Sequence, residues 1–146
     1  MSRWLAAGLT AIGVGWVIAV LLAPLSGADG SVAAWLVYHA GGTVCHQRPD
    51  RSFFLAGEPM PVCARCFGLY ASGATAALLA WTVVPGSRNG NSRAVLGMAA
   101  LPTIATIAVE WLGLVTPGSV LRALSALPLG AAAGWIFVGA LRSERG

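Results

Sequence analysis

Residues 4–25, WLAAGLTAIGVGWVIAVLLAPL, form a continuous run without a charged side chain. At 1.5 Å per residue, a helix of this length crosses a hydrocarbon layer of about 30 Å. A signal peptide is the alternative interpretation, because Arg3 precedes the run and residues 26–28 resemble a cleavage site. The run is long for the core of a signal peptide, so we interpret it as a membrane-spanning helix.

Other apolar runs of spanning length follow it. They cover residues 67–84, 94–115 and 120–141. The apolar stretch Val32–Val44 is too short to cross a bilayer and predicts an interfacial helix. The sequence therefore predicts an all-α integral membrane protein. Residues 1–146 form a single membrane domain with four transmembrane helices, one short interfacial helix and a loop at residues 45–66.

The composition fits a chain that is mostly surrounded by lipid. Hydrophobic residues make up 57% of the sequence and charged residues only 10%, whereas an ordinary soluble domain is about a quarter charged. The net charge of +4 comes entirely from arginines, which lie between the apolar runs and form no single basic patch. This pattern gives no indication of nucleic-acid binding, and the expected partner is the bilayer.

The distribution of arginines predicts an orientation. Four spans place both termini on one face and residues 45–66 on the other. The terminal face carries Arg3, Arg88, Arg93, Arg142 and Arg145, and the opposite face carries Arg48, Arg51, Arg65 and Arg122. The positive-inside rule then favours cytoplasmic termini, multi-pass insertion in the cell membrane and an extracytoplasmic motif loop. If Val32–Val44 spanned the bilayer, the loop would be cytoplasmic.

The polar segment at residues 45–66 contains all three cysteines of the chain and one of its two histidines. Cys63 and Cys66 form a Cys-x-x-Cys pair at the expected start of a helix, so both thiolates can face one centre. Cys45 and His46 complete the four soft or borderline ligands that tetrahedral zinc prefers. The sequence predicts a metal site of these four residues, with zinc as the expected ion and iron as the alternative.

The same residues support a redox interpretation. The amino end of a helix and Arg65, which lies between the two thiols, favour a thiolate, so a lowered thiol pKa is expected there. The pair could cycle between dithiol and disulfide, with Cys45 as the resolving thiol and a quinone as the partner in the membrane. A third possibility is a lipid-binding or scaffold protein in which the cysteine cluster is purely structural.

The residues of this segment also carry a resemblance. The string C-H-Q-x-P-x-R-S-F begins at Cys45, and P-V-C-A-R-C-x-G-x-Y ends at Tyr70. In both residue type and spacing they resemble the signature of a family of small predicted membrane proteins, the domain of unknown function 2085. The resemblance covers about a sixth of the chain. It supports a site in this segment and implies no particular reaction.

Charged residues near the motif supply further candidates. Arg48, Arg51 and Arg65 can form a patch that binds anionic lipid or another phosphate. The alternative is that they extend to the headgroups or pair with Asp50 and Glu58.

Glu110 lies inside an apolar run, where a carboxylate is costly. We expect it to act as a proton carrier or as the partner of an arginine, close to the cysteines. It therefore joins Cys63 and Cys66 as a catalytic candidate.

Aromatic residues indicate where the helices meet the interface. The six tryptophans, which we interpret as interfacial anchors, are Trp4, Trp16, Trp35, Trp81, Trp111 and Trp135. His39 precedes the motif by a few residues, and we interpret it as a polar interfacial histidine.

Overall fold

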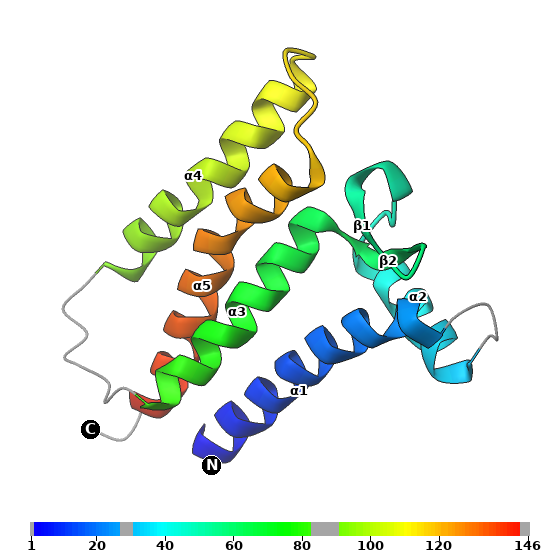
Figure 1. Cartoon of the computed structure of the whole chain (residues 1–146). Coiled ribbons are helices and arrows are strands. Elements are labelled where there is room, and N and C mark those ends of the chain that lie inside the picture. Colours follow the sequence, from blue (N-terminus) through cyan, green and yellow to red (C-terminus); the bar gives the residue numbers. More distant parts are fainter. Residues whose placement is uncertain (1, 27–30, 83–90, 144–146) are drawn as a thin grey trace.

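Figure 1 shows the computed structural model, which describes residues 2–26, 31–82 and 91–143. The elements, in chain order, are α1 Ser2–Leu22, η1 Ala23–Ser26, α2 Val32–Val44, η2 Pro49–Arg51, β1 Ser52–Leu55, β2 Glu58–Cys63, α3 Ala64–Thr82, α4 Ser92–Trp111 and α5 Ser119–Ser143.

The four long helices lie alongside one another. The α3–α5 contact is the most extensive, α4 packs on α5, and α1 packs on both α3 and α5. In Figure 1 the start of α1, the end of α3, the start of α4 and the end of α5 lie toward one end of the bundle. The short helix α2, the β1–β2 hairpin and the α4–α5 turn lie toward the other, which we call the motif end.

Three described helices are long and apolar enough to cross a membrane. They are Arg3–Ser26, Ser92–Trp111 and Ser119–Arg142. They coincide for most of their length with the expected spans at residues 4–25, 94–115 and 120–141, although α4 ends at Trp111, four residues before the expected end. Helix α3 is not among them, because Arg65 and several small polar residues reduce its hydropathy. The expected fourth span at residues 67–84 therefore stays a prediction, and its last two residues lie outside the described part of the chain.

Glycines allow α3 and α5 to approach closely. Gly130 and Gly134 are one helical turn apart on α5, the small-xxx-small spacing of tightly packed membrane helices. A Cβ atom at Gly134 would overlap the backbone oxygen of Gly73, and one at Gly68 would overlap that of Ala123. The backbones themselves are therefore in contact at two levels of the bundle.

The motif segment is more ordered than the loop that we expected, and the all-α prediction is incomplete. β1 and β2 pair antiparallel, with Ser52 opposite Cys63 and Leu55 opposite Glu58. The two residues between the strands, Ala56 and Gly57, have φ values of 53° and 87°. Positive φ at both positions is typical of a tight hairpin turn.

Helix α2 has the bounds predicted for the short apolar helix. The side chain of Ser31 accepts a hydrogen bond from the backbone N–H of Ala34 at 3.1 Å, which caps its amino end. Its last turn ends at Cys45, whose N–H donates to the oxygen of Gly41 at 2.9 Å. The end of the helix therefore places Cys45 beside Cys63, at the open end of the hairpin. Its position at a membrane interface stays a prediction.

Candidate metal centre

The three cysteines meet at the motif end of the bundle. Their Sγ atoms all lie within 4.8 Å of one another. Cys45 follows the last turn of α2, Cys63 is the final residue of β2, and Cys66 lies in the first turn of α3. We call this group the thiol cluster. Among the described residues its cysteines are free, and none is joined in a disulfide.

Gln47 fastens α2 to the hairpin and so fixes the position of Cys45. Its φ of 48° turns the chain sharply after the helix. Its side-chain amide donates to the backbone oxygen of Pro61 at 2.8 Å and to that of Tyr38. Gly41 allows the close approach, because a Cβ atom there would overlap the oxygen of Pro61. The motif residues around the cysteines therefore have a structural role of their own.

Apolar side chains surround Cys45 and partly cover Cys63 and Cys66, which are half-buried. Cys45 is buried in one core with Val20, Met60 and Val62. Aromatic residues cover it further: Trp16 contacts Tyr70 edge to face at 6.3 Å between ring centroids, and Phe53 contacts Phe67 at 6.0 Å. Such a surrounding limits water and strengthens electrostatic interactions between the sulfur atoms and any bound ion.

The geometry favours a thiolate at Cys63. This residue directly precedes α3, where unpaired backbone N–H groups and the helix dipole stabilise negative charge. The pKa of Cys63 is lowered to about 5, mainly because the Cys66 side chain donates a hydrogen bond to it. Hydrogen bonds from the Cys66 and Arg65 backbones and from the Cys45 thiol act in the same direction, and burial opposes them.

Neither histidine lies in the thiol cluster. His46 is exposed, although it directly follows the buried Cys45. Adjacent side chains diverge in extended backbone, and Cys45 has φ −142° and ψ 141°. The expected role of His46 as a fourth ligand therefore stays a prediction. His39 is exposed on α2 and stacks on Trp35 at 5.1 Å between ring centroids.

A second group of charged residues lies at the same end of the bundle. The carboxylate oxygens of Glu110 are 2.9 Å from Nη2 of Arg51, 3.4 Å from Nη2 of Arg65 and 3.0 Å from Nη2 of Arg122. These four residues, which we call the Glu110 cluster, come from α4, η2, α3 and α5 respectively. The expectation that Glu110 pairs with an arginine agrees with this arrangement.

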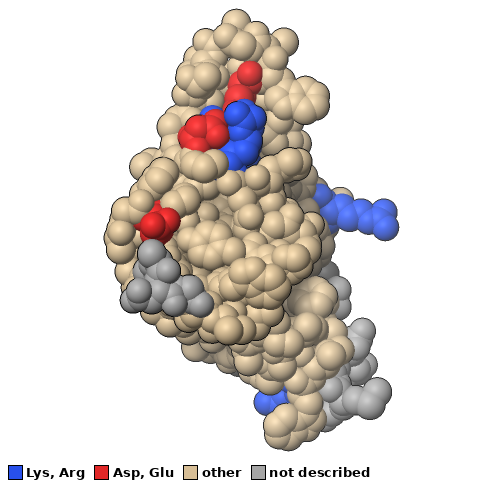
Figure 2. Space-filling view, turned by 90° about the vertical axis from the view of Figure 1, so that its right-hand side faces the viewer, with Lys and Arg blue, Asp and Glu red and all other residues tan. Residues whose placement is uncertain are grey.

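The Glu110 cluster differs from the expected arginine patch in two residues. Arg48 lies outside it, with a side chain 57% exposed and paired to Asp50 at 3.2 Å. Arg122 belongs to it and is only 7% exposed. A signal for the pairing of Arg122 with Glu110 was present in the sequence. Arg122 is the one arginine of its apolar run, in the first turn, and it follows by twelve residues the one glutamate of the preceding apolar run. Figure 2 shows acidic and basic atoms side by side toward the motif end, on a face that is otherwise mostly uncharged.

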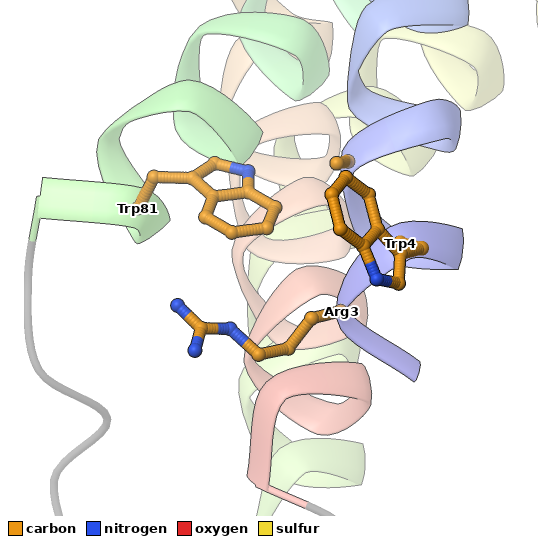
Figure 3. Close-up of a pocket in the computed structure, with 4 residues that line it drawn as sticks. Arg3, Trp4 and Trp81 are labelled. Atoms are coloured by element: carbon orange, nitrogen blue, oxygen red, sulfur yellow. The ribbon is translucent and has the colours of Figure 1, made fainter. Parts of the chain in front are cut away.

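At the opposite end of the bundle, a hollow of about 350 Å³ opens between α1 and the end of α3. Arg3, Trp4 and Trp81 border it, as Figure 3 shows. The indole N–H of Trp81 donates to Oγ1 of Thr10 at 3.2 Å, and the guanidinium of Arg142 lies 5.0 Å from the Trp81 ring centroid. Among the expected anchors, Trp16, Trp35 and Trp81 thus have intramolecular ring or hydrogen-bond contacts, while Trp4 and Trp111 are 84% and 88% exposed.

The fold and its composition define a helical membrane protein with three candidate spans in the described part of the chain and a group of cysteines that can hold a metal ion. Residues 45–136 match a family of predicted membrane proteins, the domain of unknown function 2085. Because the match covers more than half of the chain, the protein belongs to this family, as the motif resemblance implied.

Curated relatives share the sequence over limited lengths. An uncharacterized protein of Methanocaldococcus jannaschii is 52% identical over 40 residues, which are 27% of this chain and 24% of that protein. The chain therefore spans about a quarter of that relative. An uncharacterized protein of Methanothermobacter thermautotrophicus is 30% identical over 87 residues, or 60% of this chain and 78% of that protein. No solved structure matches the chain.

Proposed function

We propose that the thiol cluster is a zinc site at the membrane face, formed by Cys45, Cys63 and Cys66. The observation that carries this proposal is the convergence of three sulfur atoms, from three different elements, to within 4.8 Å. Thiolates are preferred zinc ligands, and zinc–sulfur bonds of about 2.3 Å in tetrahedral geometry separate the sulfurs by roughly 3.8 Å. Modest side-chain rotations therefore bring all three onto one ion.

The proposed ion has three protein ligands and one further coordination position. Closed structural zinc sites use four protein ligands, whereas catalytic sites keep one position for water or substrate. Because His46 is exposed and outside the cluster, we assign the fourth position to an exchangeable ligand. The ion then stabilises the junction of α2, the hairpin and α3, and it offers a Lewis-acid position for catalysis or transport.

We further propose that α3 is the fourth membrane span. Helices α1 and α4 run in the same direction in Figure 1, so the chain must return between them. Helix α3 has 19 residues, enough for about 28 Å at 1.5 Å per residue. With four spans, both termini share one side, and the positive-inside rule makes the motif end extracytoplasmic.

One observation favours a second candidate, a membrane thiol oxidoreductase. The lowered pKa of Cys63 beside the Cys66 thiol is typical of reactive Cys-x-x-Cys pairs. In that reaction the two thiols would form a disulfide, and two electrons and two protons would pass to a quinone. The sequence holds only three cysteines, so it contains no second pair that could relay the electrons onward.

Cobalt binding separates the two candidates. The protein, purified in detergent and stripped with a chelator, is titrated with Co²⁺ while the absorption spectrum is recorded. A thiolate site gives an intense sulfur-to-cobalt charge-transfer band that saturates at one ion per chain, and zinc then displaces the cobalt. Cys63→Ser should remove most of the band, while His46→Ala should leave its intensity unchanged.

The alternatives predict different results. An absent band in a protein that forms a reversible disulfide and reduces added ubiquinone would replace the zinc proposal with the oxidoreductase. An absent band without any such disulfide would leave the cluster as a structural feature of a scaffold or lipid-binding protein. A band lost in His46→Ala would contradict the exchangeable fourth position.

A further inference from the structure

We propose that the Glu110 cluster binds a phosphate-type anion through Arg51, Arg65 and Arg122. This site is distinct from the thiol cluster and does not depend on a bound metal. Its ligand chemistry is that of a phosphate group, which a lipid headgroup or a soluble phosphate compound can both supply. Arginine suits this ligand because its planar fork matches two phosphate oxygens at once.

The net charge of the Glu110 cluster favours a bound anion. Three guanidinium groups are paired with the single carboxylate of Glu110, and the only other described carboxylate near them, that of the exposed Asp50, is 3.7 Å from Arg51 and is shared with Arg48. Among the described residues, the cluster therefore keeps an excess of positive charge. Two members are largely removed from water, since the side chains of Arg122 and Glu110 are 7% and 8% exposed. Buried charges are normally compensated by partners. A further anion supplies the compensation that Glu110 alone cannot.

The three arginines of the cluster also have hydrogen-bond donors without a partner. The Nε atoms of Arg51, Arg65 and Arg122 are buried and have no hydrogen-bond partner among the described residues. Nε of Arg51 is 3.7 Å from the Asp50 carboxylate, which is too far for a good hydrogen bond. Buried donors of charged groups are rarely left unpaired, and a bound anion is one of the recognised ways to satisfy them.

The position of the cluster provides access. Arg51 is the most exposed member, with 37% of its side chain accessible, and Arg65 follows at 20%. Rotation of Arg51 admits an anion to the donors behind it. Glu110 lies next to the exposed Trp111 at the end of α4, where a spanning helix reaches the headgroup layer. Lipid phosphates are concentrated at that depth.

The test uses the full-length protein in dodecyl maltoside micelles, whose headgroups contain no phosphate, with the thermal unfolding midpoint followed by tryptophan fluorescence. One arm adds inorganic phosphate against chloride at equal ionic strength, which removes general screening. The other arm compares micelles with and without added phosphatidic acid. A ligand that binds the folded state raises the midpoint. We expect a rise of several degrees with at least one ligand.

Arg51→Gln is compared with Arg48→Gln, which makes the same change three residues away at an exposed arginine outside the cluster. The rise should be lost in Arg51→Gln, recovered in part by Arg51→Lys and retained in Arg48→Gln. A rise with phosphate alone assigns a soluble ligand, and a rise with phosphatidic acid assigns a headgroup. No rise in wild type with either ligand, or equal loss in both glutamine variants, overturns the proposal.

Discussion

The backbone N–H of Cys63 points at Sγ of Cys45, with a donor–acceptor distance of 3.2 Å. This contact joins the end of β2 to the end of α2 across a sequence separation of 18 residues. It positions one sulfur as an acceptor before any metal is bound. The thiol cluster is therefore pre-organised by the protein.

The low pKa of Cys63 predicts an unusual pH profile of its reactivity in metal-free protein. A pKa of about 5 means that the thiolate is already dominant at neutral pH, whereas an ordinary cysteine becomes reactive near pH 8.5. Alkylation by iodoacetamide, followed residue by residue with mass spectrometry, should reach its plateau below pH 7. Cys66→Ala removes the main donor and should move the midpoint upward. A rate that still climbs between pH 8 and 9 in the unsubstituted chain would contradict the assignment.

Gln47 should control the thiol cluster without touching metal. Gln47→Glu replaces a donor with a carboxylate facing the oxygens of Pro61 and Tyr38. The loss of two hydrogen bonds, with acceptors left facing each other, should cost about 2–3 kcal/mol. Chelator-induced zinc loss should become faster, as measured with a zinc-sensitive dye. Equal rates of zinc loss for Gln47→Glu and the unsubstituted protein would show that the hydrogen bonds of Gln47 between α2 and the hairpin do not help to retain the metal.

Glu110 should stabilise the folded protein, whichever of the proposed functions is correct. Glu110→Gln leaves three arginines close together in a largely buried position, and breaking a buried ion pair typically costs about 3–5 kcal/mol. The free energy of unfolding, measured in mixed detergent micelles, should fall by that order. Glu58→Gln is the matched control, because Glu58 is exposed at the start of β2. A similar small effect for both variants would contradict the structural role of the cluster.

The contact between α3 and α5 should be intolerant of a single methyl group. Gly134→Ala forces a Cβ atom into the backbone of Gly73 and should destabilise the bundle by about 1–3 kcal/mol. Gly139→Ala, on the same helix, meets nothing within 4 Å and should be neutral or slightly stabilising. Unfolding in micelles compares the two. Tolerance of Gly134→Ala equal to that of Gly139→Ala would mean that the helices are not packed this closely.

The sequence predicted the long helices well because uninterrupted apolar runs depend only on local composition. It also predicted that Cys63 and Cys66 face one centre, since the Cys-x-x-Cys spacing at a helix start is a local feature. Cys45 was placed with them because of its ligand type, and the structure brings the three sulfur atoms together. The hairpin was missed because Pro59 and Pro61 argue against a central strand, although a two-stranded hairpin has only edges.

The composition of the Glu110 cluster could not be predicted from local patterns. Its members come from four different elements, and the packing of α5 against both α3 and α4 is needed to bring them together. Arg48 and Arg51 are residues of the same type in one short polar segment. The Arg48 side chain is nevertheless exposed and paired with Asp50, whereas the Arg51 side chain reaches Glu110. The sequence likewise does not show that the His46 side chain points away from Cys45, because this depends on the backbone conformation after α2.

Elemental analysis of the purified protein tests the central claim most directly. Full-length protein, purified in detergent without added metal, is analysed for zinc and iron, and Cys63→Ser with Cys66→Ser serves as the comparison. The zinc proposal predicts about one zinc per chain in the unsubstituted protein and almost none in the double variant. A protein that is free of metal, or one whose zinc survives removal of both cysteines, would contradict it.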